Sequence, residues 1–267
     1  MELLYNPLMP NIDRHPPGAF CWIELATSDQ AAAKTFYSAL FGWTANDMPM
    51  GPSDFYTIFR LDGRDAAAGY TIRPEDRAQG VPPHWMMYIA VQSADETAAR
   101  AGRLGGKIIA PPFDVFEAGR MALIADPAGA MFSLWQPKKN LGIGIAGVPG
   151  TLCWSDLSTA DPEAAIRFYE GLLGWKITPG ENDPSGYLHI KNGEQFIGGI
   201  PPRTNRDPHA PPHWLPYFLV AGCDASIAKA QQLGAKVCLP PMTLEKVGRF
   251  AVLADPQGAV FAIFQAV

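Results

Sequence analysis

Short runs of alternating apolar and polar residues dominate the chain, and an amphipathic segment follows the first of them. The run FCWIELAT (20–27) alternates and is rich in bulky residues, which predicts a strand. Ser28 or Asp29 then offers a side chain that caps a helix N-terminus, and the helix is expected to continue to about Phe41. Gly42 follows, and glycine is the usual residue at a helix C-terminus.

The remainder of the first half continues this pattern. FYTIFRL (55–61) and AAAGYTI (66–72) predict a hairpin around Asp62-Gly63, a strong turn dipeptide. A strand at 85–91, a helix from about 94 to 104 and three further strands repeat the order. We therefore expect an α+β fold made of four βαβββ units.

The two halves of the chain are copies of each other. ADPAGAMF (125–132) returns as ADPQGAVF (254–261), and PPHW (82–85) returns at 211–214, both shifted by 129 residues. Upstream, LFGW (40–43) pairs with LLGW (172–175) at a shift of 132. Matched blocks in fixed order indicate a tandem duplication.

The repeats and the loop composition set the expected domain boundaries. Domain 1 is placed at 18–138 and domain 2 at 149–267, and the Gly-rich stretch between them indicates a linker at 139–148. Residues 1–17 carry four prolines and no period, so we expect an irregular N-terminal arm.

Charge and composition exclude several partners. The 26 acidic residues outnumber the 21 Lys and Arg, the net charge is −5, and no basic run occurs, which argues against nucleic acid and acidic membranes. No apolar stretch reaches the length of a membrane span, and no signal peptide is evident. Four cysteines without a CxxC motif are expected to be free thiols, so a cytoplasmic location is predicted.

The order of elements, together with the Asp that opens the first helix, FY within it, LGW after it and DPxGxxF before the last strand, resembles the vicinal oxygen chelate superfamily. This superfamily includes glyoxalase I, bleomycin-resistance proteins and extradiol dioxygenases. The resemblance covers both halves and implies two glyoxalase-like domains, each with an open, U-shaped mixed sheet. Metal enzymes of the superfamily place His, Gln or Glu at inward positions of defined strands.

Those metal positions hold other residues here. Counting from the motifs, they fall on Trp22, Met86, Ser133 and a site near Gly69 in the first repeat. Their equivalents in the second repeat are Trp154, Leu215, Ala262 and a site near Gly199. A catalytic divalent site needs about three ligands from His, carboxylate or thiolate. We therefore expect no metal and no other cofactor, unless a one-residue slip in the strand register has misplaced the ligands.

Strand alternation predicts which side chains line the inside of each sheet. The expected inward residues are Trp22, Glu24, His84, Met86, Tyr88, Ser133 and Trp135 in domain 1, and Trp154, Asp156, His213, Leu215 and Tyr217 in domain 2. Each domain would hold an aromatic cavity with one carboxylate and one imidazole. These residues are the candidate site.

Each candidate carries a functional and a structural interpretation. Glu24 and Asp156 would be catalytic bases or cation anchors, because an apolar cleft raises a carboxyl pKa, or they would be satisfied strand-end carboxylates. His84 and His213 would polarise a carbonyl or shuttle a proton, or they would cap loop carbonyls.

The aromatic and basic candidates divide in the same way. Trp22 and Trp154 would stack on a planar ligand or fill the barrel, and the hydroxyls of Tyr88 and Tyr217 would bind ligand or be tethered in the core. The same choice applies to the remaining ligand-binding candidates, which are Met86, Ser133 and Trp135. Arg120 and Arg249 would clamp a ligand carboxylate or pair with a nearby acid such as Glu117.

These observations support three functions. The first is metal-free binding of a small, planar organic ligand in one or both cavities, for detoxification or resistance. The second is lyase or isomerase chemistry on a small oxo compound, with a carboxylate base. In the third, one domain is a degenerate scaffold. Because the tandem domains would pair within one chain, the protein is expected to be a monomer or a homodimer.

Overall fold

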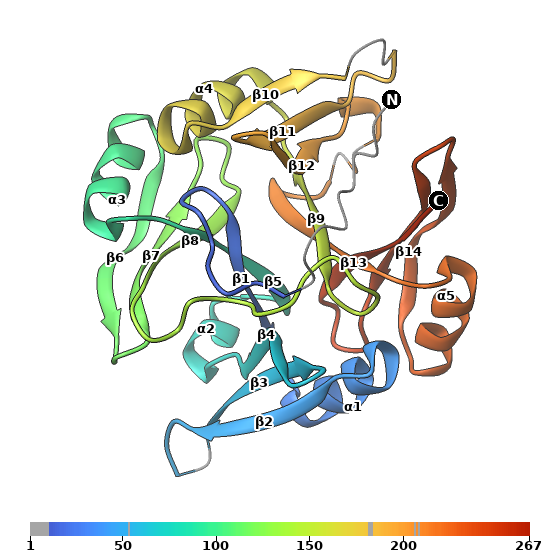
Figure 1. Cartoon of the computed structure of the whole chain (residues 1–267). Coiled ribbons are helices and arrows are strands. Elements are labelled where there is room, and N and C mark those ends of the chain that lie inside the picture. Colours follow the sequence, from blue (N-terminus) through green and yellow to red (C-terminus); the bar gives the residue numbers. More distant parts are fainter. Residues whose placement is uncertain (1–10, 53, 181–183, 206, 208) are drawn as a thin grey trace.

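Two eight-stranded mixed sheets, one from each half of the chain, form the body of the protein in a computed structural model (Figure 1). The structure describes residues 11–52, 54–180, 184–205, 207 and 209–267. The elements of the first half are β1 (Phe20–Thr27), α1 (Gln30–Phe41), β2 (Thr44–Pro49), β3 (Phe55–Leu61), β4 (Arg64–Thr71), α2 (Pro74–Ala78), β5 (His84–Ala90), α3 (Ala94–Arg103), β6 (Lys107–Val115), β7 (Gly119–Ala125) and β8 (Met131–Pro137).

The second half repeats this order. Its elements are β9 (Leu152–Ser158), α4 (Pro162–Leu173), β10 (Lys176–Pro179), β11 (Leu188–Asn192), β12 (Gln195–Ile200), a short 3-10 turn (Arg203–Asn205), β13 (His213–Leu219), α5 (Cys223–Gln232), β14 (Lys236–Leu244), β15 (Gly248–Ala254) and β16 (Val260–Ala266). The expected α+β duplication is confirmed. The strands β2 and β10 and the helix α2 were not anticipated from the sequence.

The strand order joins two four-stranded units in each sheet. In the first sheet it is β2-β3-β4-β1-β5-β8-β7-β6, and the second sheet matches it element for element. The central pair β1 and β5 is antiparallel, whereas β1 with β4 and β5 with β8 are parallel. Each βαβββ unit therefore contributes its first strand to the middle of the sheet.

Local signals explain where the first helix begins and ends. The Asp29 carboxylate accepts a hydrogen bond from Ala32 N, which satisfies an otherwise unpaired N–H of the first turn. Gly42 ends the helix with φ +78°, a backbone conformation that glycine adopts without strain. The equivalent residues Asp161 and Gly174 bound α4.

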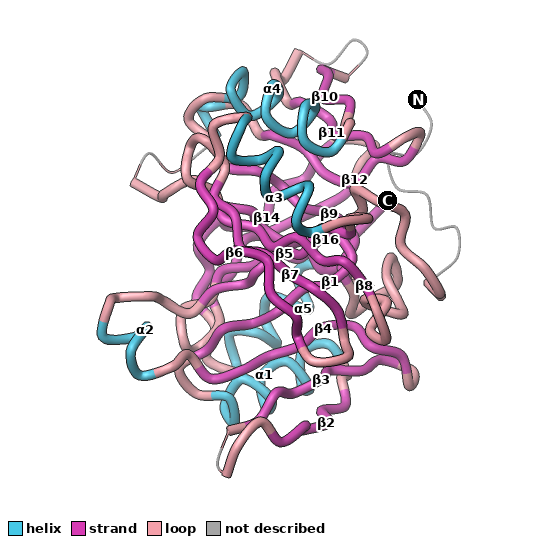
Figure 2. Tube along the Cα trace, turned by 90° about the vertical axis from the view of Figure 1, so that its left-hand side faces the viewer, coloured by secondary structure: helices cyan, strands magenta, loops and turns pink. Residues whose placement is uncertain are grey.

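Each sheet has an inner face and an outer face. The inner face is the one on which Trp22, Glu24, Met86 and Tyr88 project in domain 1, and the outer face is covered by helices. On the outer face, Tyr37 of α1 packs against Trp85 of β5, with ring centroids 5.2 Å apart. Views at right angles place α1 and α4 at opposite ends of the molecule (Figures 1 and 2).

The two domains share one hydrophobic core, which lies between their outer faces. Phe41 of α1 contacts Phe218 of β13 with centroids 4.8 Å apart, and Phe132 of β8 contacts Tyr169 of α4 at 5.6 Å. Helix α1 of domain 1 therefore packs on the second sheet, and α4 of domain 2 packs on the first. This exchange leaves the inner faces out of the domain interface.

The segment that joins the domains is packed against the first sheet. Ile143 and Ile145 are buried, and Ile143 N donates to Cys21 O at 2.7 Å. Asn11 of the N-terminal arm forms an isolated bridge with Ile145. The linker therefore bonds to the interior strands β1 and β4 of the first sheet.

Candidate functional site

A buried carboxylate bound by two tyrosine hydroxyls lies on the inner face of domain 1. Glu24 is only 8% exposed. Its Oε2 accepts a hydrogen bond from Tyr56 Oη at 2.6 Å, and its Oε1 accepts one from Tyr88 Oη at 2.9 Å. Trp22 Nε1 donates to Tyr56 Oη at 2.9 Å, so one chain of hydrogen bonds links the indole, the phenol and the carboxylate.

The register of the strands builds this cluster. Trp22 and Glu24 are two residues apart on β1, and their partners on β5 are Tyr88 and Met86. Tyr56 arrives from β3, two strands away. Because successive residues of a strand alternate between faces, all these side chains project from the same side.

Domain 2 carries the same constellation around Asp156. Its Oδ2 accepts from Tyr217 Oη at 2.8 Å, and its Oδ1 accepts from both Tyr187 Oη and Trp154 Nε1, the latter at 3.0 Å. Trp154 Nε1 also lies 2.8 Å from Tyr187 Oη. The predicted inward pairs Trp22 with Glu24 and Trp154 with Asp156 are therefore brought together as clusters.

The two clusters differ by a matched pair of substitutions. Glu24 lies beside Ala68 of β4, whereas the shorter Asp156 lies beside Gly199 of β12. A Cβ at Gly199 would come within 2.0 Å of Tyr187 Oη. Because Gly199 lacks the methyl group of Ala68, Tyr187 can approach the sheet more closely. This closer approach lets its hydroxyl reach Asp156, whose side chain is one methylene shorter than that of Glu24.

Burial sets the protonation behaviour of both clusters. It raises the pKa of the Glu24 carboxyl, and the hydrogen bonds from Tyr56 and Tyr88 act against this shift. Burial raises the pKa of Asp156 in the same way, opposed by Tyr187, Tyr217 and Trp154. The Tyr56 and Tyr88 phenols have a pKa well above the usual range, because they are buried and lie beside a carboxylate.

The histidines occupy the positions that the capping interpretation expected. His84 Nδ1 is 2.8 Å from Pro82 O, and His213 Nδ1 is 2.8 Å from Pro211 O. Both residues are partly exposed at the start of a central strand. His84 pairs with Ala26, two residues along β1 from Glu24, so its imidazole lies at the edge of the site.

Arg120 and Arg249 lie away from the carboxylate clusters, and each is paired with an acid. Arg120 pairs with Gln136 on the outer face and binds Asp95 of α3 through two hydrogen bonds of 2.7 and 2.8 Å. Arg249 binds Asp224 of α5 at 2.9 Å. The expectation that each pairs with an acid is met, but by these aspartates. Glu117 instead lies 3.6 Å from Lys139.

The remaining candidates lie on the inner face but differ in access. Ser133 is fully buried next to Tyr88 on the adjoining strand, and Trp22 is 3% exposed, as expected of a side chain that fills the barrel. Trp135 is buried, and its Nε1 donates to Asn140 O. Met86 and Trp154 are partly exposed.

Sequence reasoning missed three members of the site. Tyr56 and Tyr187 complete the carboxylate clusters, and Tyr70 of β4 is close enough for the charge of Glu24 to raise its pKa, although burial is the larger cause. The sequence signal that could have revealed Tyr56 and Tyr187 is their spacing of 131 residues. This spacing falls between the shift of 132 residues that relates the repeats upstream and the shift of 129 downstream.

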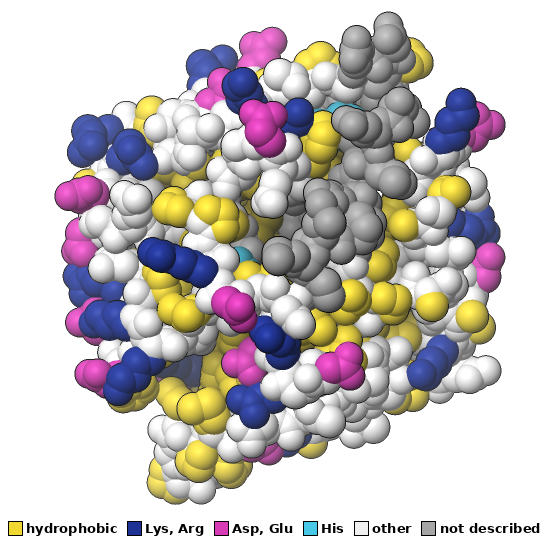
Figure 3. All heavy atoms as spheres, viewed as in Figure 1, with side chains coloured by type: hydrophobic (Ala, Val, Ile, Leu, Met, Phe, Trp, Pro, Cys, Tyr) yellow, Lys and Arg dark blue, Asp and Glu magenta, His cyan; other side chains and the backbone are white. Residues whose placement is uncertain are grey.

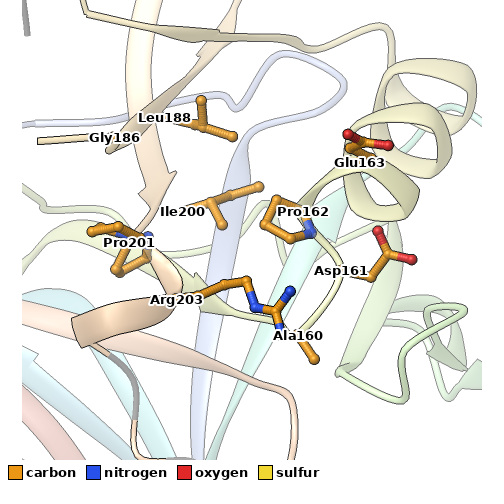
Figure 4. A pocket seen from close by; sticks show the side chains of 10 residues that line it. Ala160, Asp161, Pro162, Glu163, Gly186, Leu188, Ile200, Pro201 and Arg203 are labelled. Carbon is orange, nitrogen blue, oxygen red and sulfur yellow. The ribbon is translucent and has the colours of Figure 1, made fainter. Parts of the chain in front are cut away.

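A separate hollow lies on the outer side of the second sheet, beside the N-terminus of α4 (Figure 4). Its volume is about 690 Å³, and Asp161, Pro162, Ile200 and Arg203 are among its lining residues. In domain 1 the residue equivalent to Pro162 is Gln30, whose amide donates to Phe55 O, Thr57 Oγ1 and Gly69 O. Proline cannot make these bonds, so the side chain at this position does not bridge the neighbouring strands in domain 2.

The comparison with known families agrees with the fold. Residues 19–134 match the Glyoxalase/Bleomycin resistance protein/Dioxygenase superfamily, and residues 154–264 match the Glyoxalase-like domain. The chain belongs to this superfamily, as a tandem glyoxalase-like protein.

Two full-length relatives are similar in sequence. The Mycobacterium tuberculosis protein named "Putative glyoxylase CFP32" is 39% identical, over 96% of this chain and 98% of its own length. The anthracycline biosynthesis protein DnrV of Streptomyces peucetius is 35% identical, over 94% of each chain.

Solved structures share the fold at low sequence identity. The Mn(II)-bound glyoxalase of Novosphingobium aromaticivorans has a TM-score of 0.64 and 16% identity, covering 93% of this chain and 82% of its own. The 2,3-dioxygenase LapB of Pseudomonas sp. KL28 has a TM-score of 0.63 and 14% identity, covering 97% and 93%.

The residues present do not fit the divalent metal that the metal enzymes of this superfamily hold. The inner-face positions expected to ligate it carry Trp22, Met86, Ser133 and, by the observed register, Ala68 rather than Gly69. Within the described part of the chain, no three His, Cys, Asp or Glu residues are grouped so as to hold a metal ion. An indole, a thioether, a methyl group and one hydroxyl do not form a divalent-metal ligand set.

Proposed function

We propose that the protein binds a small, planar organic molecule on the inner face of one or both sheets, without the usual metal, and acts in detoxification or resistance by sequestration. The observation that carries the proposal is the recurrence of a buried carboxylate with two tyrosine hydroxyls and an indole in both domains. Buried acids are uncommon without a role or a charged partner.

The surroundings of Glu24 suit a flat, mainly apolar ligand. Met86, Met121 and Leu123 are half-buried on the same face, and Phe113 is 45% exposed at its rim. Thioethers and aromatic rings adapt to an apolar body, while the carboxylate cluster offers directional hydrogen bonds. The relative DnrV is named for anthracycline biosynthesis, and anthracyclines contain a planar fused-ring chromophore.

Titration with 1,4-dihydroxyanthraquinone, a planar and neutral probe, tests the proposal. We expect saturable quenching of tryptophan fluorescence, weakened at least tenfold in the Glu24→Gln/Asp156→Asn double variant. Glu96→Gln, on the exposed face of α3, and Arg120→Gln, on the outer face, should bind like the wild type. Equal affinity in the double variant and the wild type would refute the proposal.

The phenol and carboxylate contacts also favour a second candidate, an isomerase or lyase acting on a small oxo compound. With Tyr56 Oη 2.6 Å from Glu24 Oε2, the carboxylate would accept a proton from the carbon next to a carbonyl, and Tyr56 or Tyr88 would donate a hydrogen bond to the carbonyl oxygen. The same carboxyl would return the proton to the neighbouring carbon. Methylglyoxal consumption in the presence of glutathione is the assay. Glu24→Gln should abolish turnover, and the surface control Glu96→Gln should retain it.

Location and assembly remain predictions. All four cysteines are free thiols in the structure, which supports a reducing compartment such as the cytoplasm. Among the described residues, no helix is long and apolar enough to cross a membrane. The shared core between domains supports a monomer or a homodimer, which size-exclusion chromatography with light scattering distinguishes.

A further inference from the structure

The two carboxylate clusters differ in the number of hydrogen bonds that each carboxylate oxygen accepts. A carboxylate oxygen has two lone-pair sites. Glu24 receives one donor on each oxygen, from Tyr88 and Tyr56. Asp156 receives two on Oδ1 and one on Oδ2. Each oxygen of Glu24 therefore accepts a single donor and retains acceptor capacity, whereas Oδ1 of Asp156 already accepts two donors.

The position of the indole accounts for this difference. Trp22 Nε1 donates to Tyr56 Oη, whereas Trp154 Nε1 reaches both Tyr187 Oη and Asp156 Oδ1. In the second cluster the aspartate is shorter and the tyrosine lies closer to the sheet, so the phenol and the indole both contact the same carboxylate oxygen. In the first cluster the indole bonds only to the phenol.

The charge of Glu24 also lacks a partner. In the described part of the chain no Lys, Arg or His forms an ion pair with it, and its observed donors are neutral phenols. A buried carboxylate is stabilised by a cation that also donates hydrogen bonds. A ligand with both properties would complete the site.

Aromatic rings surround the same carboxylate. Trp22, Tyr56, Tyr70 and Tyr88 project on this face around Glu24, and the π-faces of such rings attract cations. In domain 2 the position equivalent to Tyr70 is Pro201, so that ring is absent there.

The face next to the cluster suits an apolar ligand body. Met86 and Met121 are partly exposed, and Met131 is 37% exposed at the rim. Their equivalents in domain 2 are Leu215, Phe250 and Val260. Flexible thioethers accommodate varied apolar shapes better than branched or rigid side chains.

We propose that the Glu24 cluster of domain 1 binds a primary ammonium group carried on an apolar or aromatic body, an aralkylamine, while the Asp156 cluster is closed by its own donors. The inference rests on the proposed function and names the ligand class and the domain. The ammonium donates to the free lone pairs of Glu24, and its body lies along the methionines.

Isothermal titration of the full chain with 2-phenylethylamine and with 2-phenylethanol tests the inference, because the two probes differ mainly in charge. We expect one equivalent of amine per chain and an affinity at least tenfold above that of the alcohol. Glu24→Gln should bring the ratio of the two affinities close to one. Asp156→Asn and the surface control Glu96→Gln should leave the ratio unchanged.

Tyr70→Ala provides a second variant in case Glu24→Gln fails to fold, and it should lower the affinity for the amine while leaving that for the alcohol unchanged. Equal binding of the two probes, an equal loss in Asp156→Asn, or no binding of the amine would overturn the inference. If 1,4-dihydroxyanthraquinone still binds under those outcomes, the proposed function stands. If none of the probes binds, both fail.

Discussion

Tyr37 of helix α1 in domain 1 donates a hydrogen bond of 2.9 Å to Oδ2 of Asp255, in the DPQG turn of domain 2. The exchange is reciprocal, since Tyr169 of α4 donates to Asp126 of domain 1 at 3.2 Å. The other oxygen of each aspartate accepts three backbone N–H groups of its own turn. The DPxG motif therefore both forms a turn and anchors the other domain.

Tyr37→Phe should destabilise the protein by about 1–3 kcal/mol, because the change leaves two buried polar groups unpaired. These are Asp255 Oδ2 and Trp85 Nε1, which donates to Tyr37 Oη at 3.1 Å. Urea unfolding measures the change. Tyr70→Phe is the control and should shift the free energy of unfolding by no more than about 0.5 kcal/mol. A Tyr37 variant as stable as the wild type would show that the contact across the domains does not stabilise the fold.

Gly199→Ala should cost about 1–3 kcal/mol, because the added methyl group overlaps the Tyr187 phenol. Adding Asp156→Glu should recover part of this loss, since the pair then matches Glu24 and Ala68 of domain 1. A double-mutant cycle by urea unfolding gives the coupling.

Gly102→Ala serves as the control for the glycine substitution. Gly102 lies in helix α3 with nothing within 4 Å of its Cβ position, so this change should be neutral or stabilising by up to about 1 kcal/mol. Additive effects of Gly199→Ala and Asp156→Glu would contradict the compensation.

The stability of the wild type relative to Glu24→Gln should fall as the pH rises above the ordinary carboxyl value of 4.5. Burial raises the pKa of Glu24 in the folded state, so the folded protein binds this proton more tightly than the unfolded chain. The stabilisation is complete below the unfolded pKa and is lost as the pH rises through the folded pKa, by at most about 1.4 kcal/mol per pH unit.

Thermal unfolding of both proteins across the acid and neutral range checks this dependence. The other buried carboxyls with a raised pKa, Asp126, Asp156 and Asp255, are common to both proteins and cancel in the difference. The pH dependence of the stability of Glu96→Gln should be parallel to that of the wild type. Parallel curves for Glu24→Gln as well would mean that Glu24 titrates alike in the folded and unfolded chains.

Metal should be dispensable for stability and probe binding. Elemental analysis of the purified protein should find far less than one metal per domain, and dialysis against EDTA should leave the Tm unchanged. Added zinc, nickel, iron or manganese should not raise the Tm, because Trp22, Met86 and Ser133 do not form a ligand set. About one tightly held metal per domain would show that other residues ligate it and would restore glyoxalase or dioxygenase chemistry as the expected activity.

Charged and hydrophobic side chains are unevenly distributed over the surface of the protein. In the view of Figure 3, charged side chains crowd the left-hand edge, where α3 lies in Figure 1, and hydrophobic side chains are frequent nearer the middle. Arg120 and Asp95 belong to the helix-covered side, and their side chains are partly to well exposed. Such exposed pairs contribute little to stability, about 0–1 kcal/mol.

Short local patterns along the chain were sufficient to predict the duplication, the α+β units and the faces of the central strands. These features depend on signals a few residues long: the alternation in 20–27, the cap at Asp29, the turn at Asp62-Gly63 and the repeated DPxG motif. The same alternation placed Glu24 and Asp156 on the inner faces. The resemblance to the superfamily, counted from its motifs, placed residues unsuited to metal at the ligand positions.

The contacts of those carboxylates depend on how the strands and domains pack, which local patterns do not predict. Tyr56 reaches Glu24 from two strands away, Arg120 turns to α3, and Tyr37 binds a turn in the other domain. Each contact depends on strand register or on the packing of one domain against the other, and neither is encoded in the local period of the chain. The acceptor sites left free on Glu24 follow from that packing, because the length of the acid and the space beside it set how many donors arrive.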